Sequence, residues 1–359
     1  MISPHWQRIL VRATNWVGDA VMSLPALRRL RAACPDAHIA VLAMPGVAGV
    51  YARETWMSEI ILLDGARGPR DWRRKWAQAR QLAELRFDAA ILLTNSFESA
   101  ALLRATGIAE RIGYRRDARG WLLTHAITAP KPGDTPRHES YYYLELLRRA
   151  GIGGAALPSG DMVIRLEGIE EARKAGTSRL AAASLNPATA PVIGLSPGAA
   201  HGTAKRWLPD RFAASAVQIA AELGGGAVAV FGTPDERELC EQVTGMVSAQ
   251  GLPARNFAGQ TKLAEYIDMA AACRVFLTND SGAMHIASAL GVPTVAVFGA
   301  TDHVGTGPTG ALARIVRHAV DCSPYPHPCL RRECPIDHRC MKAVDAAEVT
   351  RTALDLLKQ

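Results

Sequence analysis

Short, continuously apolar runs alternate with longer amphipathic stretches through the first half of the chain. The runs ILV, IAVLA and AAILL contain no polar residue, as strands of a sheet covered on both faces require. The longer stretches repeat apolar residues at helical spacing. This pattern predicts strands at Arg8–Ala13, His38–Met44, Glu59–Asp64, Phe87–Thr94 and Glu110–Tyr114, and helices at Ala20–Ala33, Arg70–Arg86 and Glu98–Thr106. Strand and helix in alternation predict parallel pairing with crossovers.

The second half repeats the pattern. It predicts strands at Pro191–Ser196, Ala227–Thr233, Val275–Asn279 and Pro293–Gly299, and helices at Pro209–Leu223, Asp235–Gln250, Leu263–Cys273, Ser281–Leu290 and Asp345–Lys358. A chain of 359 residues exceeds what one core usually supports. We therefore expect two doubly wound α/β domains, residues 1–175 and 176–359, with a boundary in the Gly-, Ala- and Pro-rich region near residues 165–190. Two such domains leave a cleft at the carboxyl ends of their strands, where ligands bind.

Composition narrows the class of protein. No apolar run approaches the roughly 18 residues that span a bilayer, and the first residues lack the apolar core of a secretory leader, so we expect a cytoplasmic protein. The net charge of +7 fits an anionic partner, or simply an Arg-rich composition. Four of the seven cysteines are crowded together, at Cys322, Cys329, Cys334 and Cys340. Their spacings lack the C-x2-C of a zinc ribbon, which favours a reduced structural loop over a metal site.

The first strand runs into the stretch NWVGDAVMSLPALRRL. Gly18 permits a tight turn, and Asp19 stands at the beginning of the predicted helix. The spacing alone favours Asp19 as a helix cap, and the alternative is a carboxylate aimed into the cleft.

The first strand of the second half runs into SPGAAHGTAKRW. Small residues at Gly198, Ala199 and Ala200 let a ligand approach the backbone, Thr203 offers a hydroxyl and Lys205 offers a positive charge. A small-residue turn with a cation suits a phosphate group. The alternative is a solvated basic loop.

Two further strand ends carry polar residues. FGTPDERE places Asp235 and Glu236 in a first helical turn, where they complement the helix dipole or accept bonds from ribose hydroxyls. TNDSGAMHIA places Ser281 and Gly282 at a helix N-terminus, which offers unpaired N–H groups to an anion. His285 shares the helix face of Ser281, and Asp280 suits a cap or a sugar-binding role better than direct contact with phosphate. Together, the polar residues that follow these strands predict a site for a nucleoside diphosphate.

The common nucleotide-binding motifs are absent. GTGPTG at residues 305–310 contains a proline and does not open a predicted helix, and no Walker A pattern occurs. A nicotinamide enzyme and a P-loop NTPase are therefore not expected.

The stretches TNDSGAMHIASALGVPTVAVFGATD, NWVGDAVMSLPALRRL and PGAAHGTAKRW resemble glycosyltransferase family 9, the ADP-heptose:lipopolysaccharide heptosyltransferases. TNSFESA and the cysteine-rich CSPYPHPCLRRECPIDHRC look most like heptosyltransferase II, although the SPYPHP insertion separates the first two cysteines more widely than this subtype leads us to expect. The resemblance implies a GT-B fold: two Rossmann-like domains facing across a cleft, the first binding the acceptor and the second ADP-heptose. The alternatives are heptosyltransferase I or III, or a non-catalytic nucleotide-binding protein.

The resemblance also implies roles for residues. In an inverting transfer, Asp19 would take the proton of the acceptor hydroxyl and Lys205 would stabilise the departing phosphate. The donor would be held by Thr203, Asp235 or Glu236, Asp280, Ser281, Gly282 and His285. No D-x-D motif is present, so neither a metal nor another cofactor is expected to be required.

The implied acceptor is a phosphorylated heptosyl-Kdo-lipid A. It would suit the basic residues Arg67, Arg70, Arg73, Arg115 and Arg116, with Arg119 close by in sequence. The stretch of residues 70–86 is basic and carries Trp72 and Trp76 four residues apart, which suits a peripheral contact with the inner membrane. An ordinary solvated helix with buried tryptophans fits the same pattern. Nucleic acid is not an expected partner.

Overall fold

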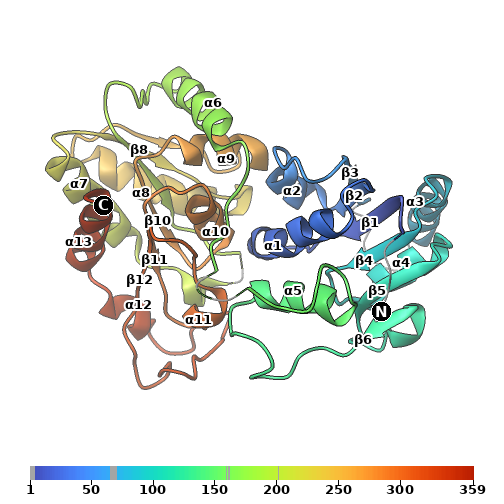
Figure 1. Ribbon diagram of the computed structural model, residues 1–359. Helices are drawn as coiled ribbons and strands as arrows, with labels where there is room; N and C mark the ends of the chain where they lie inside the picture. Colours follow the sequence, from blue (N-terminus) through green and yellow to red (C-terminus); the bar gives the residue numbers. More distant parts are fainter. Residues whose placement is uncertain (1–4, 65–70, 159, 161, 201) are drawn as a thin grey trace. The chain divides into compact units, whose positions relative to one another are not determined.

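A computed structural model describes residues 5–64, 71–158, 160, 162–200 and 202–359. The chain divides into two compact units, Met1–Gly160 and Asp161–Gln359. Each unit contains one six-stranded sheet in which all recorded strand pairs are parallel. Figure 1 shows the first unit in blue to green and the second in green to red.

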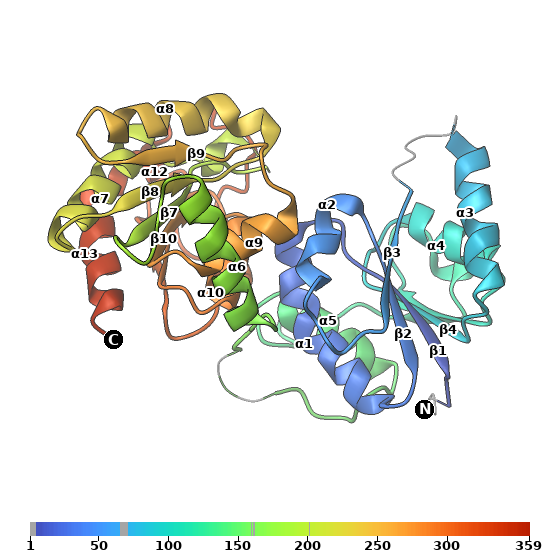
Figure 2. The ribbon, with the colours of Figure 1, turned by 90° about the horizontal axis from the view of Figure 1, so that it is seen from above.

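The N-terminal sheet has the strand order β3-β2-β1-β4-β5-β6. Its strands are β1 (Arg8–Arg12), β2 (His38–Ala43), β3 (Glu59–Leu62), β4 (Ala89–Leu92), β5 (Glu110–Tyr114) and β6 (His125–Ile127). Its helices are α1 (Val17–Ala33), α2 (Pro45–Ala48), α3 (Trp72–Glu84), α4 (Phe97–Ala105) and α5 (Ser140–Arg149), with 3-10 turns η1 (Gly49–Tyr51) and η3 (Gly120–Leu122). Helices α1 and α5 cover one face of the sheet and α3 and α4 the other, as Figures 1 and 2 both show.

The C-terminal sheet has the order β12-β11-β10-β7-β8-β9. Its strands are β7 (Val192–Ser196), β8 (Ala227–Val230), β9 (Ala254–Asn256), β10 (Val275–Asn279), β11 (Thr294–Val297) and β12 (Ala313–Val316). Its helices are α6 (Ile169–Ala182), α7 (Pro209–Glu222), α8 (Arg237–Ser248), α9 (Leu263–Ala271), α10 (Gly282–Ala289), α11 (His303–Thr306), α12 (Arg339–Ala343) and α13 (Ala346–Leu357), with 3-10 turns η4 (Thr203–Lys205) and η5 (Pro234–Glu236).

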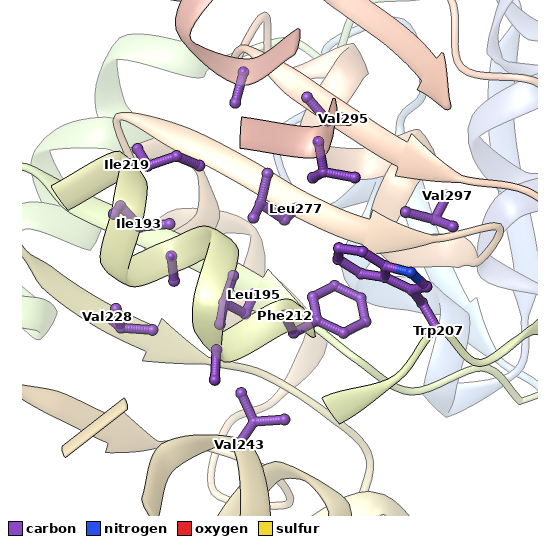
Figure 3. Packing of buried hydrophobic residues seen from close by; sticks show 14 of the residues in the cluster. Ile193, Leu195, Trp207, Phe212, Ile219, Val228, Val243, Leu277, Val295 and Val297 are labelled. Carbon is purple, nitrogen blue, oxygen red and sulfur yellow. The ribbon is translucent and has the colours of Figure 1, made fainter. Parts of the chain in front are cut away.

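The hydrophobic core of this second unit extends to the loop that follows β7. Leu195, Leu277 and Val295 come from three neighbouring strands and belong to one buried cluster with Phe212 and Ile219 of α7 (Figure 3). Trp207, in the loop after β7, meets the ring of Phe212 edge-on at 4.9 Å. Burying two aromatic rings at this place anchors the loop that carries Lys205.

The segment expected to hold the domain boundary contains a helix of the second unit. The division between residues 160 and 161 lies ahead of the expected limit at residue 175, because α6 packs against α9. The approach is close: a Cβ on Gly176 would lie 1.8 Å from the carbonyl oxygen of Asp268. Gly176 and the buried Ala172 therefore serve the packing of α6.

Two doubly wound α/β domains, the predicted fold class, are confirmed. Among the described residues, no helix is both long and apolar enough to cross a bilayer.

Candidate active site

Three loops of the C-terminal unit converge on the carboxylate of Asp280, at the end of β10. The Lys205 Nζ, from the loop after β7, lies 2.6 Å from Asp280 Oδ2. The hydroxyl of Thr301, from the loop after β11, donates to the same oxygen at 2.6 Å. The side chains of Lys205 and Asp280 are only 14% and 6% exposed. Because β7, β10 and β11 are neighbours, their carboxyl ends bring these groups to one edge of the sheet.

Asn279 fastens the Lys205 loop to this edge. Its side-chain oxygen accepts the backbone N–H of Trp207 at 2.9 Å, and its side-chain nitrogen donates to the carbonyl of Pro197 at 2.7 Å. Sequence reasoning missed both Asn279 and Thr301, although they lie within the motif TNDSG…FGATD. For Asn279 the available signal was a polar residue at the last position of a mostly apolar strand. Thr301 lies four residues beyond the end of β11, and no comparable signal marked it.

The N-terminus of α10 follows directly. Ser281 is the N-cap residue, yet its side chain makes no capping bond and its Oγ lies 3.2 Å from Thr278 Oγ1. Asp280 is therefore not the cap of this helix. Gly282 is the first helical residue and leaves the backbone accessible, while His285 is buried one turn further on. First-turn N–H groups have no partner within a helix and are suited to an anion.

The other predicted donor-binding residues have different environments. Thr203 is exposed on the same 3-10 turn as Lys205. Glu236 is buried, and its Oε2 accepts the backbone N–H of Thr233 at 2.9 Å. The carboxyl also fills the space beside Gly198, where a Cβ would lie 2.1 Å from Glu236 Cδ. Asp235 is exposed in the same turn. Glu236 thus shapes the loop, and Asp235 presents its carboxylate to solvent.

The cysteine-rich segment, residues 322–340, packs against the loop that carries Lys205. The backbone N–H of Ala204 donates to the carbonyl of Arg332 at 3.0 Å, and that of Leu330 donates to the carbonyl of Ala300 at 2.8 Å. Ala204 and Ala300 adjoin a cavity of about 50 Å³ that is also lined by Cys322, Cys329, Cys334 and Cys340. The segment therefore contacts two of the three loops that meet at Asp280.

The four thiols in this cavity are free. Burial raises the pKa of Cys340, and the other three cysteines raise it further. Within the described ranges, no group of three or more His, Cys, Asp or Glu side chains is arranged to hold a metal ion.

Asp19 occupies the carboxyl edge of the N-terminal sheet. The N-cap of α1 is Trp16, and Asp19 lies in the first turn of the helix, partly exposed. The spacing of the sequence favoured Asp19 as the cap, which the structure corrects: the helix begins at Val17, earlier than predicted. A first-turn carboxylate is still stabilised by the helix dipole.

A second carboxyl group, Glu139, lies close to Asp19. Glu139 directly precedes α5, which packs against α1. Burial raises the pKa of Glu139 to about 7; the charge of Asp19 raises it further and that of Arg116 opposes the rise. Sequence reasoning assigned no role to Glu139, because its nearness to Asp19 depends on the packing of two helices far apart in the chain.

The predicted acceptor-binding arginines divide into groups. Arg67 and Arg70 lie outside the described residues. Arg73 is exposed on α3, and Arg115 and Arg116 are exposed in the turn after β5. Arg119, in the same basic cluster of the sequence, is instead fully buried and donates to the carbonyl oxygens of Thr94 and Tyr114. Burial lowers its pKa to about 10. Arg119 therefore joins the loops after β4 and β5 and is not an acceptor contact.

Comparison with known proteins places this geometry in a family. The model of "Glycosyltransferase family 9 (heptosyltransferase)" matches residues 75–339. The chain belongs to glycosyltransferase family 9. It is 32% identical over 311 residues to the lipopolysaccharide heptosyltransferase 2 of Escherichia coli, covering 86% of this chain and 88% of the relative. The lipooligosaccharide heptosyltransferase 2 of Haemophilus influenzae is 30% identical over 315 residues, covering 86% and 88%.

A solved member of family 9 has the same fold over nearly its whole length. The structure of E. coli ADP-heptose lipopolysaccharide heptosyltransferase II matches with a TM-score of 0.81 and 29% identity, covering 98% of this chain and 99% of that one. The predicted GT-B class, the resemblance to family 9 and the expectation of a glycosyltransferase are confirmed. Lipopolysaccharide heptosyltransferase 1 of Pseudomonas aeruginosa is also similar, at 27% identity over 342 residues, covering 91% and 87%.

Proposed function

We propose that this enzyme transfers L-glycero-D-manno-heptose from ADP-heptose to the heptosyl-Kdo-lipid A inner core of lipopolysaccharide, the reaction of a heptosyltransferase II. One observation carries the proposal: in a member of family 9, a Lys and a helix N-terminus meet at one carboxylate on the sheet edge where such folds bind nucleotides. The similarity to proteins named heptosyltransferase 2 over 86% of the chain supports the subtype.

The donor is proposed to bind along the carboxyl edge of the C-terminal sheet. The first-turn N–H groups of α10 and the small residues of the loop after β7 receive the pyrophosphate, with the hydroxyls of Thr203 and Ser281 beside it. Lys205 offsets the charge of Asp280, which removes the repulsion that a lone carboxylate would exert on phosphate. His285 lies on the same helix, near the heptose. Of the two acids after β8, exposed Asp235 suits the ribose hydroxyls, since Glu236 is already bonded to Thr233.

The chemistry assigned to the chain is a single inverting displacement. Asp19 removes the proton from the acceptor hydroxyl while the hydroxyl oxygen forms a bond to the anomeric carbon of the heptose. The bond between that carbon and the diphosphate oxygen breaks, and ADP leaves with the electron pair. Base assistance contributes about 10²–10⁴-fold. Lys205 and the N–H groups of α10 stabilise the charge that develops on ADP, and no metal or other cofactor is assigned to the step.

The acceptor is proposed to approach the N-terminal unit. Exposed Arg73, Arg115 and Arg116 suit the phosphate groups of lipid A and its core, and Arg67 and Arg70 share this proposal on sequence alone. The enzyme would work at the cytoplasmic face of the inner membrane, as a peripheral protein. Seven free thiols suit a reducing compartment.

A transfer assay tests the function and the subtype together. ADP-heptose is offered with acceptors that carry zero, one or two heptoses, and the product is identified by mass spectrometry. Transfer to the one-heptose acceptor alone is expected. Transfer to the zero-heptose or the two-heptose acceptor would instead identify heptosyltransferase I or III, and binding of the donor without any transfer would identify a non-catalytic protein.

A further inference from the structure

The N-terminal unit exposes four large aromatic side chains in one region. Trp72 and Trp76 of α3 are 60% and 55% exposed, Phe97 at the start of α4 is 44% exposed, and Trp121 in η3 is 66% exposed. We call these four residues the aromatic face. Aromatic side chains in a hydrophobic core bury most of their surface area. A cluster of aromatic side chains exposed to solvent therefore marks an interaction site.

Printed contacts connect the elements that carry these rings. Lys75 of α3 forms an ion pair with Glu98 of α4 at 2.9 Å, so the first turns of the two helices are neighbours. The rings of Phe97 and Trp121 lie 6.1 Å apart. Trp72 and Trp76 are four residues apart and share one stripe of α3. That stripe remains exposed, while the residues that α3 buries are Gln78, Ala79 and Leu82.

Positive charge is interleaved with the aromatic face. The guanidinium of Arg73 lies 5.6 Å from the centre of the Trp72 ring, and that of Arg104 lies 6.0 Å from the centre of Trp121. Arg80 is exposed one turn beyond Trp76. The nearby acid Glu98 already pairs with Lys75. The surface therefore combines amphipathic rings with cations, as surfaces that lie in the headgroup layer of a bilayer do.

The position of the aromatic face ties it to the reaction. Phe97 follows β4, and Trp121 lies in the segment between β5 and β6. Asp19 follows β1, and β1, β4 and β5 are adjacent and parallel. Phe97 and Asp19 therefore extend from the same carboxyl edge of one sheet, at neighbouring strands.

We propose that the aromatic face docks this enzyme on an anionic phospholipid bilayer, with its indole rings among the headgroups and Arg73, Arg80 and Arg104 against lipid phosphates. The inference rests on the proposed function in one respect: the proposed acceptor is anchored in a membrane, which gives the enzyme a reason to bind there. Docking at this edge brings a lipid-linked sugar to Asp19 without extracting the lipid from the membrane. Charge complementarity favours a bilayer over an apolar protein partner, because cations and indole rings alternate across the surface.

Vesicle binding tests the proposal without donor or acceptor. The full-length protein is sedimented with vesicles of phosphatidylglycerol and phosphatidylcholine, and with phosphatidylcholine vesicles alone. We expect binding to the anionic vesicles that weakens as salt is raised. The pair Trp72→Ser/Trp76→Ser should weaken it about tenfold or more. Tyr325→Ser is the matched control, because Tyr325 is 56% exposed but belongs to the other unit; its binding should equal that of the unaltered protein.

A charge series completes the design. Arg80→Glu/Arg104→Glu should weaken binding to anionic vesicles about tenfold or more, since each cation near such a surface contributes about 1 kcal/mol. Arg255→Glu/Arg351→Glu makes the same change of net charge at exposed positions of the C-terminal unit and should have a smaller effect. Circular dichroism of every variant establishes that it is folded.

Three outcomes would overturn the proposal: no binding to anionic vesicles, equal binding by Trp72→Ser/Trp76→Ser and the unaltered protein, or binding only when acceptor glycolipid is added to the vesicles. The last would mean that the face recognises the sugar rather than the bilayer. Transfer to detergent-dispersed acceptor is measured separately, so a failure of the proposed function is distinguished from a failure of docking.

Discussion

Lys205 and Asp280 form an ion pair of 2.6 Å that joins the loop after β7 to the end of β10. The two residues are 75 positions apart in the sequence, and both side chains are largely hidden from solvent. A buried pair of this kind is held as a unit, because removal of one partner leaves an uncompensated charge. To the donor diphosphate proposed above, the pair would offer a cation whose position is already fixed by the protein.

Replacement of Lys205 separates its chemical role from its structural one. Lys205→Ala should lower kcat/KM about 10²–10³-fold and weaken donor binding, because the charge that develops on ADP loses a fixed cation. The variant should also melt at a lower temperature, since the hydroxyl of Thr301 is then the one side-chain partner of Asp280 among the described residues. Steady-state kinetics, calorimetry with ADP-heptose and thermal unfolding measure the three effects.

A double variant provides the control. Lys205→Ala/Asp280→Asn removes both charges and should recover much of the lost stability without recovering transfer. Lys174→Ala, an exposed position on α6, should change neither quantity. Normal kinetics in Lys205→Ala would place this side chain outside the site.

Asp19→Asn isolates the proposed proton transfer. The amide keeps the shape of the side chain but cannot accept the proton, so transfer should fall about 10²–10⁴-fold while ADP-heptose binds with unchanged affinity. Asp36→Asn makes the same change at an exposed position beyond the other end of α1 and should behave as the unaltered enzyme. Full turnover by Asp19→Asn would refute the assignment of Asp19 as base.

The sequence predicted the core strands well, because buried parallel strands leave a continuous apolar signal. Glu110–Tyr114 and Val275–Asn279 were predicted with the bounds that β5 and β10 have. The strands that sequence reasoning missed are short ones at or beside the sheet edges, His125–Ile127, Ala254–Asn256 and Ala313–Val316. Only three or four residues long and partly exposed, they carry too few apolar residues for periodicity to appear.

Prediction of the candidate site was limited in a different way. Lys205 and Asp280 could be singled out because each follows an apolar strand, but their ion pair depends on the order of strands in the sheet. Arg119 looked like part of a basic surface, and only the fold reveals that it is buried between two loops. Sequence reasoning missed Glu139 for a similar reason, because its environment is created by the packing of α5 against α1.

Glu139 should make stability depend on pH. Its pKa is about 7 in the folded protein and 4.5 as an ordinary glutamate, so the folded chain holds a proton that the unfolded chain has released. Stability is then greatest below pH 4.5 with respect to this group and falls as pH rises towards 7. Glu139→Gln should therefore stabilise the protein on the order of 1–2 kcal/mol at pH 8 and hardly at all at pH 4.5.

Urea unfolding at several pH values measures this difference. Glu84→Gln, at an exposed position on α3, is the control and should show no trend with pH. A constant difference between Glu139→Gln and the unaltered protein from pH 5 to 8 would contradict a raised pKa.

Gly202→Ala tests whether the cysteine-rich segment positions the Lys205 loop. Gly202 has φ of +134°, which side chains rarely adopt, and a Cβ there would lie 2.1 Å from the carbonyl oxygen of Arg332. The backbone must therefore shift, and the bond from Ala204 to the same carbonyl should break with it. Because Lys205 follows Ala204 directly, its amine should lose its fixed place beside Asp280, and transfer should fall about 10-fold or more. Gly224→Ala also has positive φ but meets no atom within 4 Å, so it should lose some stability while keeping its transfer rate. Equal rates for the two variants would show that contact with the segment does not position Lys205.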